Sequence, residues 1–187
     1  YVEMYVNEDG GAISESDYKG IFVLREKIKR SKNRVDIERL DELHNDLPQV
    51  SGGYIVKSDK YNIGDILLAD GAGGIVDPDY LETAPYGIQV TGGRKPILAE
   101  PDFLVATQPQ IDWIADYINE VSSVLWQNTG SDYYPGPEFD YIDYLDVTSW
   151  IDHFIIEQIC ADADAFWGSY FTHKDRGGKI YSGPPWD

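Results

Sequence analysis

Hydrophobic and polar residues alternate in the first part of the chain, which is the pattern of β-strands. Residues 1–6 alternate in this way, and residues 7–11, Asn-Glu-Asp-Gly-Gly, are typical of a turn. A second apolar run covers residues 21–24 and continues towards Ile28. The pattern predicts an antiparallel hairpin, with a polar excursion over residues 14–19 at its tip.

Further strands are predicted at apolar segments next to glycines. Residues 52–57 begin with two glycines and are expected to form a third strand. Residues 86–90 and 97–99 flank Thr-Gly-Gly-Arg at 91–94, which favours another hairpin.

One helix is predicted in the middle of the chain, where apolar residues recur every three or four positions. Thr107 and Gln110 would form a capping box at its start, and Pro109 is tolerated in a first helical turn. The residues expected on its buried face are Ile111, Ile114, Ile118, Val121 and Leu125.

A second helix is predicted from Trp150 to Ala161, with a capping box of Ser149 and Asp152. We expect Cys160, the single cysteine, to be buried on the apolar side of this helix. The residues expected to form that apolar side are Ile151, Phe154, Ile155 and Ile159.

The chain ends in the pattern of a further hairpin. Residues 169–173 and 179–182 are strand-like, and Lys-Asp-Arg-Gly-Gly at 174–178 is a strong turn signal. Strands precede the helices along most of the chain, which favours an α+β fold over a wound parallel sheet.

Composition and charge narrow the function. A chain of 187 residues with 42% hydrophobic residues is long enough for one globular domain with a core. Its formal net charge of −18 would repel nucleic acids and anionic membranes, and favours a basic polypeptide or a cation as partner. No apolar run approaches the roughly 18 residues of a membrane span, so we expect no membrane insertion.

Acidic residues near the end of the chain are the main candidates for chemistry. Asp162 and Asp164 follow the second predicted helix, where negative charge opposes the helix dipole, and Asp187 follows the last hairpin. This layout could hold a metal ion between two chain segments. The alternative is an acidic loop exposed to solvent.

Five segments resemble, in the same order, the CotH-type (spore coat protein H) kinase family. They are YKGIFVLREKI (18–28), RVDI (34–37), GGYIVK (52–57), SWIDHFIIE (149–157), and SYFTHKDRGGKI closing on GPPWD (169–187). The resemblance implies an atypical protein-kinase-like fold, with antiparallel strands, then helices, then a hairpin that carries a metal-binding Asp. It also implies that residues 1–187 are a single domain and a fragment of a larger kinase domain, without its N-terminal and C-terminal parts.

The implied activity is Mg²⁺-dependent transfer of the ATP γ-phosphate to Ser of secreted or spore-surface proteins. In the family an acid after the helix is catalytic and the acid after the aromatic residue binds metal, so Asp164 and Asp187 would take these roles. Asp162 stands where the family usually has Asn and could share the cation. A basic, Ser-containing protein is the expected substrate, outside the cell or at the spore or cell surface of a bacterium.

The sequence contains neither a Gly-x-Gly-x-x-Gly loop nor a Walker lysine motif. Phosphate contacts are therefore expected from basic side chains, with Lys57, Arg25, Arg34, Lys174 and Lys179 as candidates. Glu26 could pair with Lys57 as a kinase glutamate would. Tyr181 could stack on adenine.

Two other functions fit the sequence. A secreted carbohydrate-active enzyme would need two carboxylates across a sugar-sized cleft, such as Asp164 with Glu157 or Asp187. A non-catalytic pseudokinase or calcium-dependent binding module is the other alternative. The Asp-Gly-Ala-Gly-Gly segment at 70–74 occurs once and without a period, which speaks against a calcium repeat.

Overall fold

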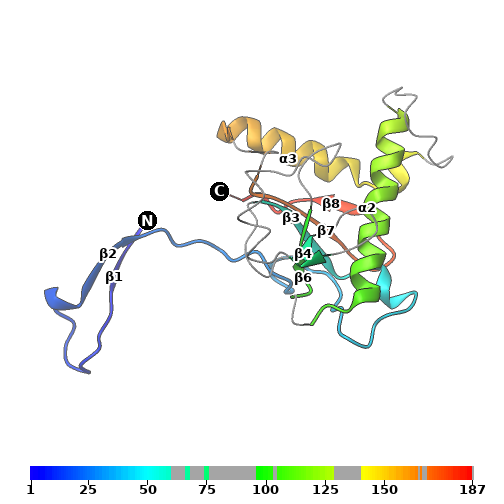
Figure 1. Ribbon diagram of the computed structural model, residues 1–187. Helices are drawn as coiled ribbons and strands as arrows, with labels where there is room; N and C mark the ends of the chain where they lie inside the picture. The colour runs from blue at the N-terminus through cyan, green and yellow to red at the C-terminus, as the bar shows by residue number, and fades with distance from the viewer. Residues whose placement is uncertain are drawn as a thin grey trace.

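The protein is described by a computed structural model over residues 1–59, 66–67, 74–75, 96–102, 105–128, 140–163, 165 and 168–186. Within these residues, a two-stranded ribbon at the N-terminus stands away from a body that consists of a six-stranded sheet and two α-helices (Figure 1). This arrangement is a mixed α+β fold with antiparallel sheets, as the sequence predicts.

The ribbon pairs β1 (Val2–Tyr5) with β2 (Tyr18–Phe22) in antiparallel register, which confirms the predicted hairpin. The tip contains a short 3₁₀ helix, Glu15–Asp17. The second strand begins and ends earlier than predicted. Val2, the first residue of β1, pairs with Phe22. The apolar residues that follow Phe22 therefore have no pairing partner in β1.

The six strands of the body lie in the order β5-β4-β6-β3-β7-β8, and every neighbouring pair is antiparallel. The predicted strand at 86–90 lies outside the described residues, whereas the other predicted strands of the body are confirmed. The strands are β3 (Tyr54–Ser58), β4 (Ile66–Leu67), β5 (Gly74–Ile75), β6 (Ile97–Glu100), β7 (Tyr170–Lys174) and β8 (Ile180–Ser182).

The glycine pair before β3 is required by a close backbone approach. A Cβ on Gly52 would lie 2.1 Å from the backbone nitrogen of Arg176, in the turn between β7 and β8. Gly53 has a φ of +103°, a conformation that side chains rarely permit. The two glycines therefore let the chain enter the sheet against that turn.

Helix α2 (Gln108–Asn128) packs on one face of the sheet, as its period predicts. Ile114 is 1% exposed at the centre of this contact, but Leu125, at the far end, is exposed. At the start of α2, only one of the two hydrogen bonds of the predicted capping box is present. The Gln110 side chain accepts from the Thr107 backbone N–H at 3.1 Å, whereas the Thr107 hydroxyl contacts Asn45 instead.

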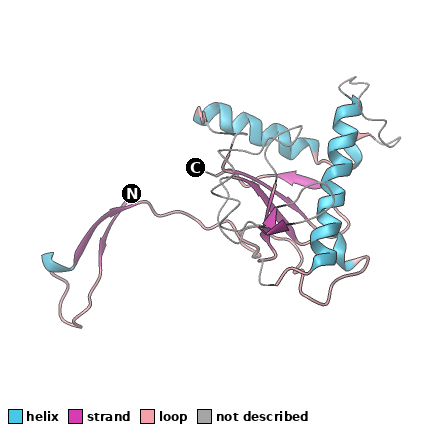
Figure 2. Cartoon of the chain, viewed as in Figure 1, coloured by secondary structure: helices cyan, strands magenta, loops and turns pink. Residues whose placement is uncertain are grey.

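Helix α3 (Val147–Cys160) begins three residues before its predicted start. Its N-cap is Asp146, whose carboxylate accepts from the Ser149 backbone N–H at 2.9 Å. The predicted capping box at Ser149 is therefore wrong. A short 3₁₀ helix, Tyr141–Asp143, precedes α3, and another, Gln49–Ser51, precedes β3 (Figure 2).

The predicted apolar face of α3 points away from the protein body. The only buried side chains of this helix, all of which the structure describes, are His153 and Glu157. Cys160 is exposed, contrary to expectation. The exposed apolar residues are Ile151, Phe154, Ile155, Ile156 and Ile159.

Both helices cover the same face of the sheet, here called the helix face. It carries Tyr54, which packs with α2, and Tyr170, which stacks on His153 of α3. The opposite face is covered by the linker between the hairpin and the body, and we call it the linker face. There Val35 and Ile37 form a core with residues of β3 and β7.

We predict that unfolding experiments can detect that the apolar side of α3 is exposed. Ile155→Ala should lower the free energy of unfolding by less than about 0.5 kcal/mol, because Ile155 is 48% exposed. Ile114→Ala, the matched control in α2, should cost about 2–5 kcal/mol by leaving a cavity. Equal losses in urea titrations of the two variants would contradict the described orientation of α3.

Candidate functional site

The register of the sheet decides which face each basic residue occupies. Side chains alternate along a strand, and directly opposite residues of neighbouring strands share a face. Lys57 pairs with Phe171, whereas Lys174 pairs with Tyr54. Lys57 therefore lies on the linker face and Lys174 on the helix face.

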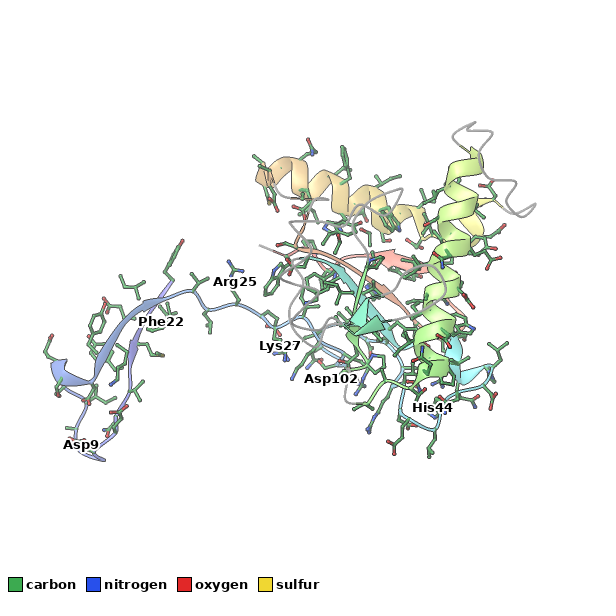
Figure 3. The ribbon with its side chains drawn as sticks, in the orientation of Figure 1. Asp9, Phe22, Arg25, Lys27, His44 and Asp102 are labelled. Carbon is green, nitrogen blue, oxygen red and sulfur yellow. The ribbon has the colours of Figure 1, made fainter. Side chains whose placement is uncertain are left out.

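Three of the predicted nucleotide-binding residues share the linker face. The guanidinium of Arg25 lies over the Trp186 ring, 5.3 Å from its centroid, and Trp186 packs edge-on against Phe171 at 5.9 Å. Phe171 in turn is the direct neighbour of Lys57 across β3 and β7. Figure 3 shows Arg25 on the extended segment that joins the hairpin to the body.

Tyr181 is the third of these residues. It pairs with His173 across β7 and β8, and the two rings stack with centroids 5.5 Å apart. Burial lowers the pKa of His173, opposed by the hydrogen bond to the Gly183 carbonyl and by the charge of Asp175. Tyr181 itself is 38% exposed.

Lys174 is placed differently from this group. Its Nζ lies 4.6 Å from the Tyr117 ring centroid and 5.3 Å from that of Trp113, both on α2. It also donates to the carbonyl of Gly178. With 3% exposure, the ammonium is enclosed between α2 and the turn after β7.

A phosphate that contacts Lys57 cannot also contact Lys174, because the sheet separates them. The structure therefore does not bring Lys57 and Lys174 together. Lys174 lies as a buried cation among aromatic rings, and no local pattern in the sequence signals this, because the contact forms by long-range packing. Glu26, the predicted partner of Lys57, forms an ion pair with Arg34 instead.

Basic residues gather on the linker despite the acidic character of the chain. Six of the 15 basic residues fall within residues 25–34. Arg30 forms an ion pair with Glu100 at the end of β6, with the closest atoms 3.8 Å apart. The linker face is therefore the side of the sheet where cations accumulate.

The acids Asp164 and Asp187 lie outside the described residues, but the segments that lead to them are described. Helix α3 ends at Cys160, and its C-cap residue Ala161 has a left-handed φ of 53°. The backbone N–H of Asp162 then donates to the Glu157 carbonyl at 3.2 Å and closes the last turn. Asp162 is half-buried at this helix end.

The segment after β8 is held against β7 by hydrogen bonds. The Gly183 N–H donates to the Phe171 carbonyl at 2.8 Å, and the Gly183 carbonyl accepts from His173 Nδ1 at 3.0 Å. Trp186 then packs on Phe171, as described above. The residues that precede Asp187 are thus held on the linker side of β7.

A buried polar network joins α3 to β8. His153 Nδ1 lies 2.7 Å from the Ser182 Oγ, and Nε2 lies 2.8 Å from the Glu157 Oε1. The Ser182 hydroxyl also contacts the Tyr170 hydroxyl. The residues predicted from the sequence do not include this network, for which the spacing of four between His153 and Glu157 was the available signal.

The Ser182–His153–Glu157 arrangement has the order of a hydrolase triad, in which backbone amides near the serine would stabilise an oxyanion. The Ser182 N–H donates to the Ser149 Oγ at 3.0 Å, and the Gly183 N–H is bound to Phe171. Of the amides that the structure describes, neither of these two is available to a developing oxyanion. The hydrogen bonds of the network join α3 to β8.

Within the part of the chain that the structure describes, no three His, Cys, Asp or Glu side chains converge as a metal site would require. Of the three predicted acidic residues only Asp162 belongs to this part. Neither described helix has both the length and the hydropathy that a bilayer span needs.

These features define a mixed α+β protein whose two acid-bearing segments are held to one antiparallel sheet. The chain belongs to the CotH kinase family: the family model described as CotH kinase protein matches residues 1–187, the whole chain. Membership suggests a kinase-like function. Searches among curated proteins and among solved structures found no match.

Lys174 should leave a pH signature in stability. Burial lowers its pKa from 10.5 to about 8, while the Asp175 charge opposes the shift. Between these values the unfolded chain keeps a proton that the folded protein has released, so the free energy of unfolding rises with pH through this group. We expect a gain of about 1–2 kcal/mol from about pH 7.5 to about pH 9.5 relative to Lys174→Met.

The measurement is urea unfolding at several pH values, with Lys27→Met as an exposed-lysine control. The control should follow the wild-type curve. Parallel curves for the wild type and Lys174→Met would contradict the enclosed ammonium.

Proposed function

We propose that this protein is an atypical protein kinase that transfers the γ-phosphate of ATP to Ser residues with the help of Mg²⁺. The observation that carries the proposal is the match of the CotH kinase family over residues 1–187. The transferred group is a phosphoryl, and its transition state requires positioning and charge neutralisation more than covalent help.

Two acids are assigned separate roles in this proposal. Asp164 orients the Ser hydroxyl and accepts its proton, and Asp187 holds the cation, with Asp162 as a further ligand. Carboxylate oxygens are the donors that Mg²⁺ prefers. When bound, Mg²⁺ neutralises charge on the phosphates.

The nucleotide is assigned to the linker face. Lys57 and Arg25 are the proposed phosphate contacts, and Tyr181 is the proposed stacking partner of adenine. The proposal is supported by the register that gives Lys57 and Tyr181 the same face and by the packing of Arg25 on Trp186 beside them. Lys174 is left out, for the reason given above.

Substitution of the two acids should separate their roles. In the full-length protein, Asp164→Asn should reduce phosphate transfer by at least about a hundredfold and leave ATP affinity within about twofold, because a hydroxyl-orienting acid acts mainly in the transition state. Asp187→Asn should weaken Mg²⁺-ATP binding as well, because a metal ligand also acts in the ground state. Radiolabelled transfer assays and calorimetry measure the two effects.

Full kinase activity in Asp164→Asn would show that this acid is not catalytic. Equally tight ATP binding in EDTA would remove the cation from the proposal. Thermal shifts with ATP and Mg²⁺, with oligosaccharides, and with Ca²⁺ alone distinguish a kinase from a carbohydrate-active enzyme and from a calcium-dependent module.

The proposed substrate is a basic, Ser-containing protein outside the cell or at the cell or spore surface. A net charge of −18 attracts basic segments over long range. Peptides with Ser between Lys or Arg residues should therefore show a higher kcat/KM than acidic ones. The difference should shrink between about 0.05 and 0.5 M salt, where the screening length falls from roughly 14 to 4 Å.

A matched pair of peptides with the same Ser and inverted flanking charges is the appropriate test. Equal phosphorylation of both peptides at low salt would rule out charge-based selection.

A further inference from the structure

We infer that His153 is a positioning residue of the kinase reaction: its hydrogen bonds to Ser182 and Glu157 hold the end of α3 against the segment that follows β8. The inference rests on the proposed function. Residues 162–164 follow directly from α3, and residues 183–187 follow directly from β8. One imidazole thus lies between the two segments that lead to the proposed acids.

The protons of the network can be assigned from its chemistry. A carboxylate only accepts, so His153 Nε2–H donates to Glu157; in the neutral imidazole, Nδ1 then accepts from the Ser182 hydroxyl. Ser182 Oγ then accepts from the Tyr170 hydroxyl. Burial raises the pKa of Tyr170 to about 12, which keeps that hydroxyl protonated as a donor. Every polar hydrogen in the chain of contacts has one acceptor.

Burial makes this network costly to break. His153 is 4% exposed, Glu157 is 5% exposed and Ser182 is 9% exposed. Loss of one member removes a hydrogen-bond partner from its buried neighbours, which water cannot readily replace at this depth. The network is also directional, so it fixes one rotation of α3, whereas apolar contacts would tolerate several.

The connection to both acid-bearing segments is short. Glu157 binds His153 with its side chain and the Asp162 N–H with its carbonyl. Ser182 is followed at once by Gly183, whose N–H is bound to Phe171. A slip of α3 by one residue would rotate it by about 100° and shift it by about 1.5 Å. Displacements near 1 Å can cost about a hundredfold in rate.

The experiment measures steady-state kinetics of the full-length protein and four variants. His153→Ala and Ser182→Ala should each lower kcat by at least about tenfold, with the KM for ATP within about twofold, because neither residue contacts the nucleotide in the proposal. Glu157→Gln should retain most activity, since its amide oxygen can still accept from Nε2–H. Ile155→Ala, on the exposed side of the same helix, should match the wild type.

Hydrogen exchange supplies a readout that is independent of catalysis. In His153→Ala the amides of Asp162 and Gly183 should exchange faster, whereas amides in the middle of α2 should not change. Should His153→Ala fail to fold, Ser182→Ala carries the same comparison with a smaller change.

The outcomes separate the two proposals. An inactive wild type would overturn the proposed function itself. An active wild type with Ser182→Ala and His153→Ala as active as Ile155→Ala would overturn the positioning role and leave the kinase function standing. A higher KM for ATP with an unchanged kcat would also overturn the positioning role, because it would indicate a contact with ATP.

Discussion

The orientation of α3 depends on two hydrogen bonds from one buried imidazole. His153 bonds to Ser182 of β8 and to Glu157 one turn further along its own helix. These contacts turn the polar side of α3 inward and leave its apolar side exposed, against its hydrophobic pattern. Buried polar pairs add little net stability, but they favour one arrangement over its neighbours, because any other arrangement leaves a desolvated group unpaired.

The sheet register is the second constraint, because it divides the basic residues between two environments. Lys174 is enclosed by aromatic rings of α2, where its charge is costly and its pKa falls to about 8. Lys57 lies on β3, the strand next to the one that carries Lys174, three residues after Tyr54. It therefore lies on the opposite face of the sheet from Tyr54 and Lys174. A single alternation of side chains thus places one of these cations against the aromatic rings of α2 and the other on the linker face.

The distribution of charge fits a kinase in an acidic protein. The chain has a formal net charge of −18, yet the segment over residues 25–34 concentrates six of its 15 basic residues. A nucleotide would meet local positive charge there, while a basic protein substrate would be attracted by the rest of the molecule. In the proposed function these two requirements are opposite in sign, and different regions of one chain would meet them.

The sequence alone determined the elements whose signals are local: the hairpins, from their turn residues, and α2, from its period. It also determined the family, because the order of short motifs survives without any structure. Only the tertiary structure decided which side of α3 is buried, that Asp146 rather than Ser149 caps it, and which face holds Lys174. The physical reason is that a periodic pattern specifies a helix and which of its residues share an apolar side. Whether that side is buried depends on packing partners that are distant in the sequence. Ser182, the partner of His153, is contributed by another element through a contact that no local pattern records.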